Sequence, residues 1–312
     1  MARRINLATF SSVPSTLVAR TSPDQAVQQV IEHWQAKIGK VLPDRPDLIL
    51  LPEVADMPAI HGTDIDGYLA ARGTQVRDYL ASVARENKCY IAYSSLRSDP
   101  AGVRRNSMVV LDRKGQPAGY YDKRHLTLDE FDNQGLRYGD SDAIIKCDFG
   151  RIACVICFDL NFEGARQRIA AAGPDLILFS SMYHGGLMQA YWAYSCRAHF
   201  VAALHNKPSA ILWPTGEMVA CTTNYFDYAT AQVNLDCGLF HLDFNRTKLE
   251  AAKARYGRKL SLRDPGLIGS VLLTCEDDEL TIGQIAREFQ LEPLDDYFNR
   301  ASAHRHTHLN DR

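Results

Sequence analysis

Two hydrophobic patterns alternate along this chain. Short runs of apolar and β-branched residues predict strands, and longer segments with apolar residues at every third or fourth position predict helices. The predicted strands are residues 5–10, 48–51, 89–96, 106–111, 119–122, 144–149, 152–156, 176–179, 210–213, 218–221 and 229–235. The predicted helices are residues 23–40, 67–87, 164–172 and 189–203. This alternation predicts a layered α/β domain.

One short sequence occurs twice. Residues 46–50, Pro-Asp-Leu-Ile-Leu, recur at residues 174–178, each time after an amphipathic segment. The simpler interpretation is that each copy marks the start of an ordinary buried strand in a parallel sheet. The other is a duplicated β-α-β layout, in which two sheets share one core between outer helices. Both interpretations predict the same layered class of fold.

The chain divides by pattern near residue 243. No low-complexity linker interrupts residues 1–243, which we predict to form one catalytic domain. The pattern then weakens, so we expect residues 244–312 to be a C-terminal extension with no core pattern of its own, packing on the domain or on a partner subunit. Its apolar residues need a surface to cover, which favours a homodimer or a larger even-numbered oligomer. These residues are Leu262, Leu267, Ile268, Val271, Leu272 and Leu273.

Composition and charge narrow the class of partner. The chain is 46% hydrophobic and 23% charged, and its 35 basic residues nearly balance its 37 acidic ones. Without a basic run we expect no nucleic-acid partner, and without about 18 consecutive apolar residues we expect no membrane span. The eight cysteines are too sparse for a disulfide scaffold. We therefore expect a cytoplasmic protein with reduced thiols that acts on a small molecule.

Three predicted strands end in reactive side chains. Glu53 follows the strand at 48–51, Lys123 follows the strand at 119–122, and Cys157 follows the strand at 152–156. Strand ends are where α/β folds commonly keep their sites. Each residue alone has an ordinary structural explanation. Together they supply the nucleophile, base and oxyanion stabiliser that acyl transfer requires.

The local sequences around these residues resemble the nitrilase superfamily, the Glu-Lys-Cys carbon–nitrogen hydrolases. The resemblance rests on Leu-Pro-Glu53, Tyr-Asp-Lys123-Arg-His-Leu and Cys157-Phe-Asp, in that order, and covers residues 4 to 243. It implies a four-layer α-β-β-α sandwich that needs no metal or cofactor. Glu130, seven residues after Lys123, matches the second glutamate of the family.

The resemblance also implies roles for these residues. Cys157 is the expected nucleophile, Glu53 the base, and Lys123 and the backbone N–H of Phe158 the oxyanion donors. Glu130 is expected to orient Lys123 or the substrate. Its alternative is a surface ion pair with an arginine.

The substrate is less well defined by the sequence. Many relatives continue as Cys-x-Asp-x-Arg-Phe-Pro-Glu, whereas this chain has Asn161 for the arginine and Glu163-Gly164 for the Pro-Glu pair. The Cys157-Phe158-Asp159 sequence favours amides or N-carbamoyl compounds over nitriles, by resemblance alone. Tyr183 and His184, within residues 182–191, are predicted to contact the substrate.

Other interpretations of these residues remain. Cys154 and Cys157 have the spacing of a redox or zinc pair, but three steps along a strand direct them to opposite faces. His125 or His205 could pair with Cys157 as in Cys–His hydrolases, and a nitrile is the alternative substrate. The histidines at 304, 306 and 308 could bind a metal, although a frayed terminus explains them better. The chain could also be a non-catalytic scaffold of the same fold.

Overall fold

The computed structural model describes residues 1–14, 21–58, 65–142 and 144–309. The chain forms two compact units, Ile5–Gln232 and a second that combines Met1–Arg4 with Val233–Arg312. Each unit has its own sheets and its own hydrophobic core.

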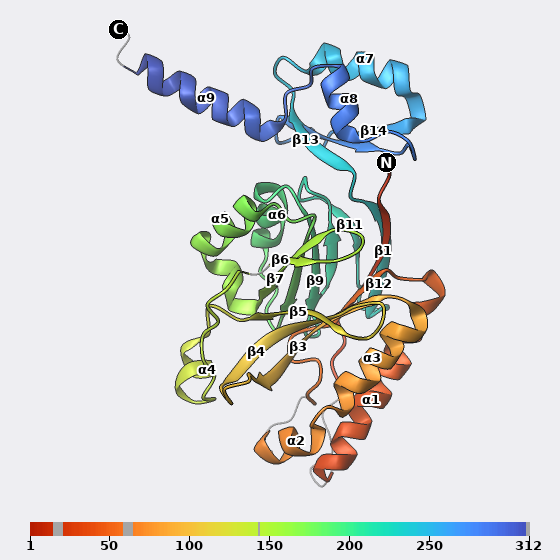
Figure 1. Cartoon of the computed structure of the whole chain (residues 1–312), viewed down its shortest axis with the longest axis vertical. Helices are drawn as coiled ribbons and strands as arrows, with labels where there is room; N and C mark the ends of the chain where they lie inside the picture. The colour runs from red at the N-terminus through yellow and green to blue at the C-terminus, as the bar shows by residue number, and fades with distance from the viewer. Residues whose placement is uncertain (15–20, 59–64, 143, 310–312) are drawn as a thin grey trace. The chain divides into compact units, whose positions relative to one another are not determined.

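The larger unit contains two six-stranded sheets (Figure 1). The first has the order β12 (Tyr228–Asn234), β1 (Arg4–Phe10), β2 (Leu48–Leu50), β3 (Tyr90–Ser98), β4 (Arg104–Leu111) and β5 (Pro117–Asp122). The second has the order β11 (Met218–Cys221), β10 (Ala210–Leu212), β9 (His199–Leu204), β8 (Leu176–Ser181), β7 (Arg151–Ile156) and β6 (Ile144–Lys146).

The two sheets pack face to face between helices. Buried hydroxyl groups join them, since Thr9 Oγ1 donates to the carbonyl of Ala202 at 2.6 Å and Ser180 Oγ to that of Leu51 at 2.7 Å. Helices α1 (Pro23–Ile38) and α3 (Gln75–Asn87) cover the outer face of the first sheet. Helices α5 (Glu163–Ala172) and α6 (Leu187–Ser195) cover the outer face of the second. The predicted four-layer α-β-β-α sandwich is confirmed.

The repeated Pro-Asp-Leu-Ile-Leu sequence occupies equivalent places in the two sheets. It leads into β2, which pairs in parallel with β1 and β3, and into β8, which pairs in parallel with β7 and β9. In both copies the aspartate accepts a backbone N–H from the neighbouring strand: Asp47 from Asn6 at 2.9 Å, and Asp175 from Arg151 at 2.8 Å. These contacts fix the register of the pairs, and they support the duplicated layout.

Two predicted helices differ from the structure. The segment 67–87 contains two helices, α2 (Ile65–Arg72) and α3, because the chain turns at Gly73, where φ is +44°. The segment 189–203 is helical only as far as Ser195. Its second half belongs to β9, whose residues are all buried. A strand covered on both faces has no alternating pattern, so its apolar run resembles a buried helix.

Short helices complete the larger unit. They are α4 (Leu128–Asp132) and the 3₁₀ helices η1 (Leu42–Asp44) and η2 (Cys157–Asn161). Both α4 and η2 contribute to the site described below.

The C-terminal unit has a core, so the expectation that this segment lacks one is wrong. Its sheet has the order β13 (Cys237–His241), β15 (Ser270–Cys275) and β14 (Leu260–Arg263). The helices are α7 (Arg246–Tyr256), α8 (Ile282–Glu288) and α9 (Leu294–His308), with the 3₁₀ helix η3 (Gly257–Lys259). The core includes Phe240, Leu249, Leu260, Val271 and Leu273. The weak helical pattern of α7 arises because only Leu249 and Ala252 are buried in it.

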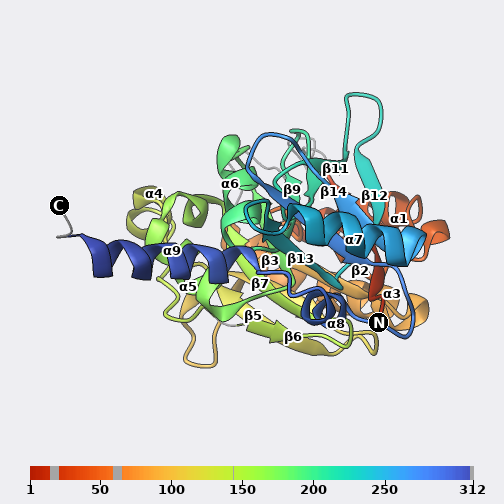
Figure 2. The ribbon, with the colours of Figure 1, turned by 90° about the horizontal axis from the view of Figure 1, so that it is seen from above.

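This core also changes the case for an oligomer. Val271, Leu272 and Leu273 are buried within the chain, whereas Leu262 and Leu267 are exposed. Helix α9 extends away from its sheet in both views (Figures 1 and 2), and Leu294 is its buried residue. The homo-oligomer therefore stays a prediction.

No helix among the described residues is long and apolar enough to cross a membrane.

Candidate active site

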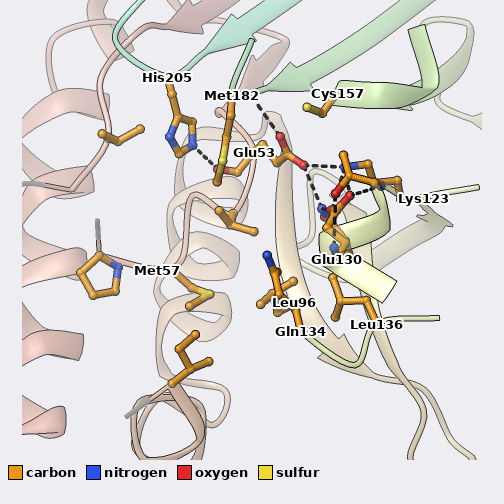
Figure 3. A pocket seen from close by; sticks show the side chains of 16 residues that line it. Glu53, Met57, Leu96, Lys123, Glu130, Gln134, Leu136, Cys157, Met182 and His205 are labelled. Carbon is orange, nitrogen blue, oxygen red and sulfur yellow. Dashed lines mark hydrogen bonds and ion pairs between the residues drawn. The ribbon is translucent and has the colours of Figure 1, made fainter. Parts of the chain in front are cut away.

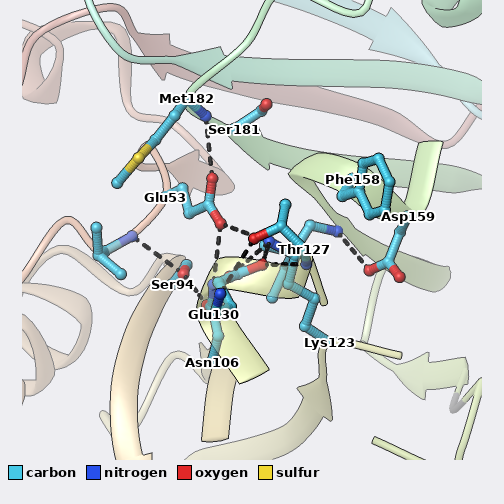
Figure 4. A network of polar contacts seen from close by, with 12 residues as sticks. Glu53, Ser94, Asn106, Lys123, Thr127, Glu130, Phe158, Asp159, Ser181 and Met182 are labelled. Atoms are coloured by element: carbon cyan, nitrogen blue, oxygen red, sulfur yellow. Dashed lines mark hydrogen bonds and ion pairs between the residues drawn. The ribbon is translucent and has the colours of Figure 1, made fainter. Parts of the chain in front are cut away.

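Glu53 is held by donors from both sheets. It lies just beyond β2 and is 3% exposed. Its Oε1 accepts from Asn106 Nδ2 at 2.9 Å and from Lys123 Nζ at 3.2 Å. Its Oε2 accepts from the backbone N–H of Met182, just after β8, at 3.0 Å. The carboxylate is therefore fixed in one orientation at the interface of the sheets (Figure 4).

Lys123 is a buried ammonium group between two glutamates. It follows β5, and its Nζ lies 2.7 and 2.8 Å from the two carboxylate oxygens of Glu130 in addition to its contact with Glu53. Burial alone would lower the pKa of Lys123, but the negative charges of Glu53 and Glu130 outweigh it and raise that pKa. Lys123 therefore keeps its charge at neutral pH.

Glu130 is positioned by the start of α4. Thr127 and Glu130 form a capping box, in which the Glu130 side chain accepts the N–H of Thr127 at 2.8 Å and the Thr127 hydroxyl accepts the N–H of Glu130 at 3.2 Å. Burial opposes ionisation of Glu130, but Lys123 outweighs it and lowers the pKa of the carboxyl group. Glu130 thus orients Lys123, and the alternative of a surface ion pair does not fit its buried position.

Cys157 begins η2 directly after β7, with φ at +47°. A non-glycine residue in this region carries about 1–3 kcal/mol of backbone strain, which surrounding contacts must hold. Asp159, 1% exposed, supplies four of them. It accepts from the N–H of Ile156 (3.2 Å), the hydroxyl of Tyr121 (2.8 Å), the N–H of His125 (2.8 Å) and Nδ1 of His125 (2.9 Å).

The Asp159→Asn variant should lower the stability of the larger unit by roughly 1–3 kcal/mol, because an amide NH₂ group would face donors that a carboxylate now accepts. Urea unfolding followed by tryptophan fluorescence measures this, since Trp34, Trp192 and Trp213 all lie in that unit. Asp66→Asn, at a carboxylate that is 75% exposed, is the control and should change stability by less than about 0.5 kcal/mol. Equal stability of the two variants would contradict the role given to Asp159.

The thiol of Cys157 is protonated in the resting site. Burial, followed by the negative charge of Glu53, raises its pKa to about 11, and Lys123 offsets this only in part. A thiol with that pKa needs a base to remove its proton at the moment of attack. The carboxylate of Glu53 lines the same cavity as this thiol.

These groups share one cavity of about 620 Å³ (Figure 3). Cys157, Glu53, Lys123 and Glu130 gather at one end of it, and mainly apolar side chains extend from there. The described lining residues are Val13, Glu53, Val54, Met57, Pro58, Ile65, Leu96, Asn106, Lys123, Thr127, Glu130, Gln134, Leu136, Cys157, Met182 and His205.

Of the predicted supporting and substrate residues, Glu130 lines this cavity, whereas Phe158, Tyr183 and His184 are not among its described lining residues. The N–H of Phe158 is in the first turn of η2, where N–H groups have no acceptor within the helix, so it suits an oxyanion donor. Tyr183 packs against Phe179, and burial raises its pKa to about 12. The contact of Tyr183 and His184 with substrate stays a prediction.

Several residues of the site were not predicted from the sequence. Asn106, in β4, donates to both glutamates, at 2.9 and 3.2 Å, and accepts the Ser94 hydroxyl at 2.9 Å. Ser94 in turn accepts the N–H of Val54, next to Glu53, at 3.0 Å. Of the contacts in the site, only the Thr127–Glu130 capping box could have been recognised in the sequence, from the Thr-x-x-Glu spacing that marks the start of a helix. Asn106 and Ser94 resemble ordinary polar residues of a strand.

The histidine alternatives are not supported by the geometry. The ring of His205 contacts the carbonyl oxygen of Glu53, and burial lowers its pKa. His125 is bound to Asp159 and stacks on Phe162 at 3.8 Å between ring centroids. The histidines at 304, 306 and 308 lie in α9, so that segment is a helix and not a frayed terminus. Among the described residues, no group of three His, Cys, Asp or Glu side chains could hold a metal ion.

A four-layer sandwich that gathers a glutamate, a lysine and a cysteine in one cavity defines the class of the protein as nitrilase-like. The family model described as carbon–nitrogen hydrolase matches residues 18–236. The chain therefore belongs to the carbon–nitrogen hydrolase family, and its resemblance to the nitrilase superfamily is confirmed.

Curated relatives are similar at low identity. The chain is 25% identical over 252 residues to the nitrilase and fragile histidine triad fusion protein NitFhit of Drosophila melanogaster, covering 69% of this chain and 52% of that protein. It is 23% identical over 265 residues to the chloroplastic omega-amidase of Arabidopsis thaliana, covering 75% and 70%. The matched part spans about half the length of the first few curated relatives.

Solved structures share the fold. Nit3 of Saccharomyces cerevisiae, of branch 10 of the nitrilase superfamily, aligns with a TM-score of 0.61 at 16% identity, over 74% of this chain and 90% of Nit3. An amidase from Nesterenkonia sp. aligns with a TM-score of 0.62 at 16% identity, over 74% of this chain and 89% of the amidase. At these identities the likeness shows the fold alone.

Proposed function

We propose that this chain hydrolyses a non-peptide carbon–nitrogen bond of a small linear amide or N-carbamoyl compound through a thioester on Cys157. The observation that carries the proposal is the arrangement of Glu53 and Lys123, 3.2 Å apart and nearly inaccessible to solvent, in the cavity that also contains the Cys157 thiol. Burying an ammonium group and two carboxylates is costly because these groups must be desolvated. Their burial beside a cysteine with a strained backbone therefore favours an enzyme over a non-catalytic scaffold.

We infer from the hydrogen bonds of Glu53 which of its oxygens receives the proton. Among the described residues, Oε1 accepts two donors, whereas Oε2 accepts one, the N–H of Met182. Oε2 therefore takes the thiol proton as the sulfur of Cys157 attacks the carbonyl carbon.

Lys123 stabilises the oxyanion that forms in this step. The carbonyl π bond breaks and leaves a negative charge on oxygen, while Glu53 becomes neutral. Before this step the negative partner of Lys123 is the Glu53 carboxylate, and after it the partner is the oxyanion. The net charge buried in the site therefore stays the same. The N–H of Phe158 supplies the second donor.

The remaining steps use the same groups in reverse. As the tetrahedral intermediate collapses, Glu53 returns its proton to the nitrogen, the carbon–nitrogen bond breaks and ammonia or an amine leaves. Glu53 then takes a proton from water, which attacks the thioester. The carbon–sulfur bond breaks, Cys157 recovers its proton and the acid is released.

An amide should be a better substrate than the nitrile with the same carbon chain. An amide forms an oxyanion that Lys123 and the Phe158 N–H stabilise directly, whereas a nitrile forms a thioimidate that must be protonated on nitrogen. We expect kcat/KM for the best amide or N-carbamoyl compound to exceed that of the matching nitrile by at least ~10-fold. Ammonia release by the purified chain measures both, and equal or nitrile-favouring values would replace the amidase proposal with a nitrilase.

A further inference from the structure

The end of the cavity away from Cys157 is apolar. Figure 3 shows Leu96, Gln134 and Leu136 next to Glu130, and Met57 farther from the carboxylates. Leu96 and Leu136 belong to one small cluster of buried residues, and Met57 packs against it. Met57, Leu96 and Leu136 form an apolar wall that can bury carbon chains. The amide of Gln134 is a polar side chain beside them, and its Nε2 already donates to Asp129 at 2.8 Å.

The described lining also lacks a positive charge that a substrate could use. Lys123 is its one lysine or arginine, and it is bound to Glu130 and Glu53. His205 contacts the carbonyl of Glu53, and burial lowers its pKa, so it is neutral at pH 7. The charge of Lys123 is therefore already paired with Glu53 and Glu130. A carboxylate on the substrate would lose its water without gaining a cationic partner among the described lining residues.

We propose that the substrate of this site is a neutral amide with an unbranched apolar chain of about four to six carbons, and not an amide with a terminal carboxylate or an N-carbamoyl amino acid. The inference rests on the proposed function and narrows the two substrate classes it leaves open. The cavity volume of about 620 Å³ lies within the range of ordinary ligand pockets, so a chain longer than that of acetamide fits.

A matched pair of amides tests the charge preference. Hexanamide and adipamic acid have the same chain and the same amide group, and differ only in a terminal methyl or carboxylate. We expect kcat/KM for hexanamide to exceed that for adipamic acid by at least ~100-fold, since burying an unpaired carboxylate is costly. Hexanamide should also exceed acetamide by roughly 200-fold if its four additional methylene groups are fully buried, at about 0.8 kcal/mol each. Equal or better hydrolysis of adipamic acid or N-carbamoyl-β-alanine would overturn the inference and leave the hydrolase standing.

A charge placed in the apolar wall tests the mechanism of selection. Met57→Lys keeps an unbranched side chain of similar length and adds an ammonium group. We expect it to raise the ratio of kcat/KM for adipamic acid over hexanamide by at least ~10-fold. The control, Met57→Leu, is neutral and should leave this ratio low. If Met57→Lys leaves the ratio of kcat/KM for adipamic acid over hexanamide unchanged, the cavity does not select its substrate by charge at this position.

Binding to an inactive variant separates this inference from the proposed function. Cys157→Ala removes the sulfur and leaves the apolar wall unchanged. Calorimetry should show hexanamide binding at least ~30-fold more tightly than adipamic acid. If hexanamide binds more tightly but the wild-type chain does not hydrolyse it, the hydrolase proposal is wrong and the inferred substrate class still stands. No preference, or tighter binding of adipamic acid, would overturn the substrate class.

Discussion

The Cys157→Ala variant should have less than a hundredth of the wild-type kcat, because no other group in the described lining of the cavity can form the thioester. The methyl group of alanine fills most of the space of the thiol, and Asp159 still holds the turn that follows β7. The unfolding curve monitored by tryptophan fluorescence should therefore stay close to that of the wild type. Ammonia release from the best amide substrate measures the loss.

A second cysteine provides the matched control. Cys221, in β11, is half-buried like Cys157 but is not among the described residues of the cavity. Cys221→Ala should keep most of the activity. Activity of Cys157→Ala above a hundredth of wild type, or a comparable loss in Cys221→Ala, would mean that the nucleophile has been wrongly assigned.

Glu53→Gln and Lys123→Ala should each lower kcat by two to four orders of magnitude. Glutamine keeps the shape of glutamate but cannot take the thiol proton, so both half-reactions fail. Removing a single oxyanion donor typically costs ~10²–10³ in kcat. Lys123→Ala also leaves Glu53 and Glu130 buried without their cation, which should lower stability by about 3–5 kcal/mol.

The division between kcat and KM identifies the role of Lys123. An effect on kcat indicates an interaction made in the transition state, whereas an effect on KM alone would make Lys123 an anchor for the substrate. Lys146→Ala, on the exposed lysine of β6, is the control and should change neither constant. The variants should be assayed below the temperature at which Lys123→Ala begins to unfold.

Much of the site could be predicted because its reactive residues follow buried strands. The apolar sequences of β2 and β7 are unmistakable, and each leads directly into Glu53 or Cys157. The repeated Pro-Asp-Leu-Ile-Leu sequence also predicted equivalent strands, since Asp47 and Asp175 have the same hydrogen-bonding task in the two sheets.

The unpredicted parts depend on contacts between distant segments. The N–H of Met182 reaches Glu53 only after the two sheets have packed, and a backbone N–H has no signature in a sequence. Asn106 is 24 residues from Glu130 and 53 from Glu53, so its bridge between them follows from the register of β4. Similarly, the C-terminal core is assembled from β13, β15 and α8, none of which has a strong pattern of its own.

The central claim is that a thioester forms on Cys157, and mass spectrometry of the acid-quenched reaction tests it most directly. The full chain is mixed with its best amide substrate, quenched during the first turnovers, digested and mapped. We expect the mass of the acyl group on the peptide that contains Cys157, appearing together with a burst of ammonia. An unmodified Cys157 throughout that burst, or an acyl group on another residue, would contradict the account.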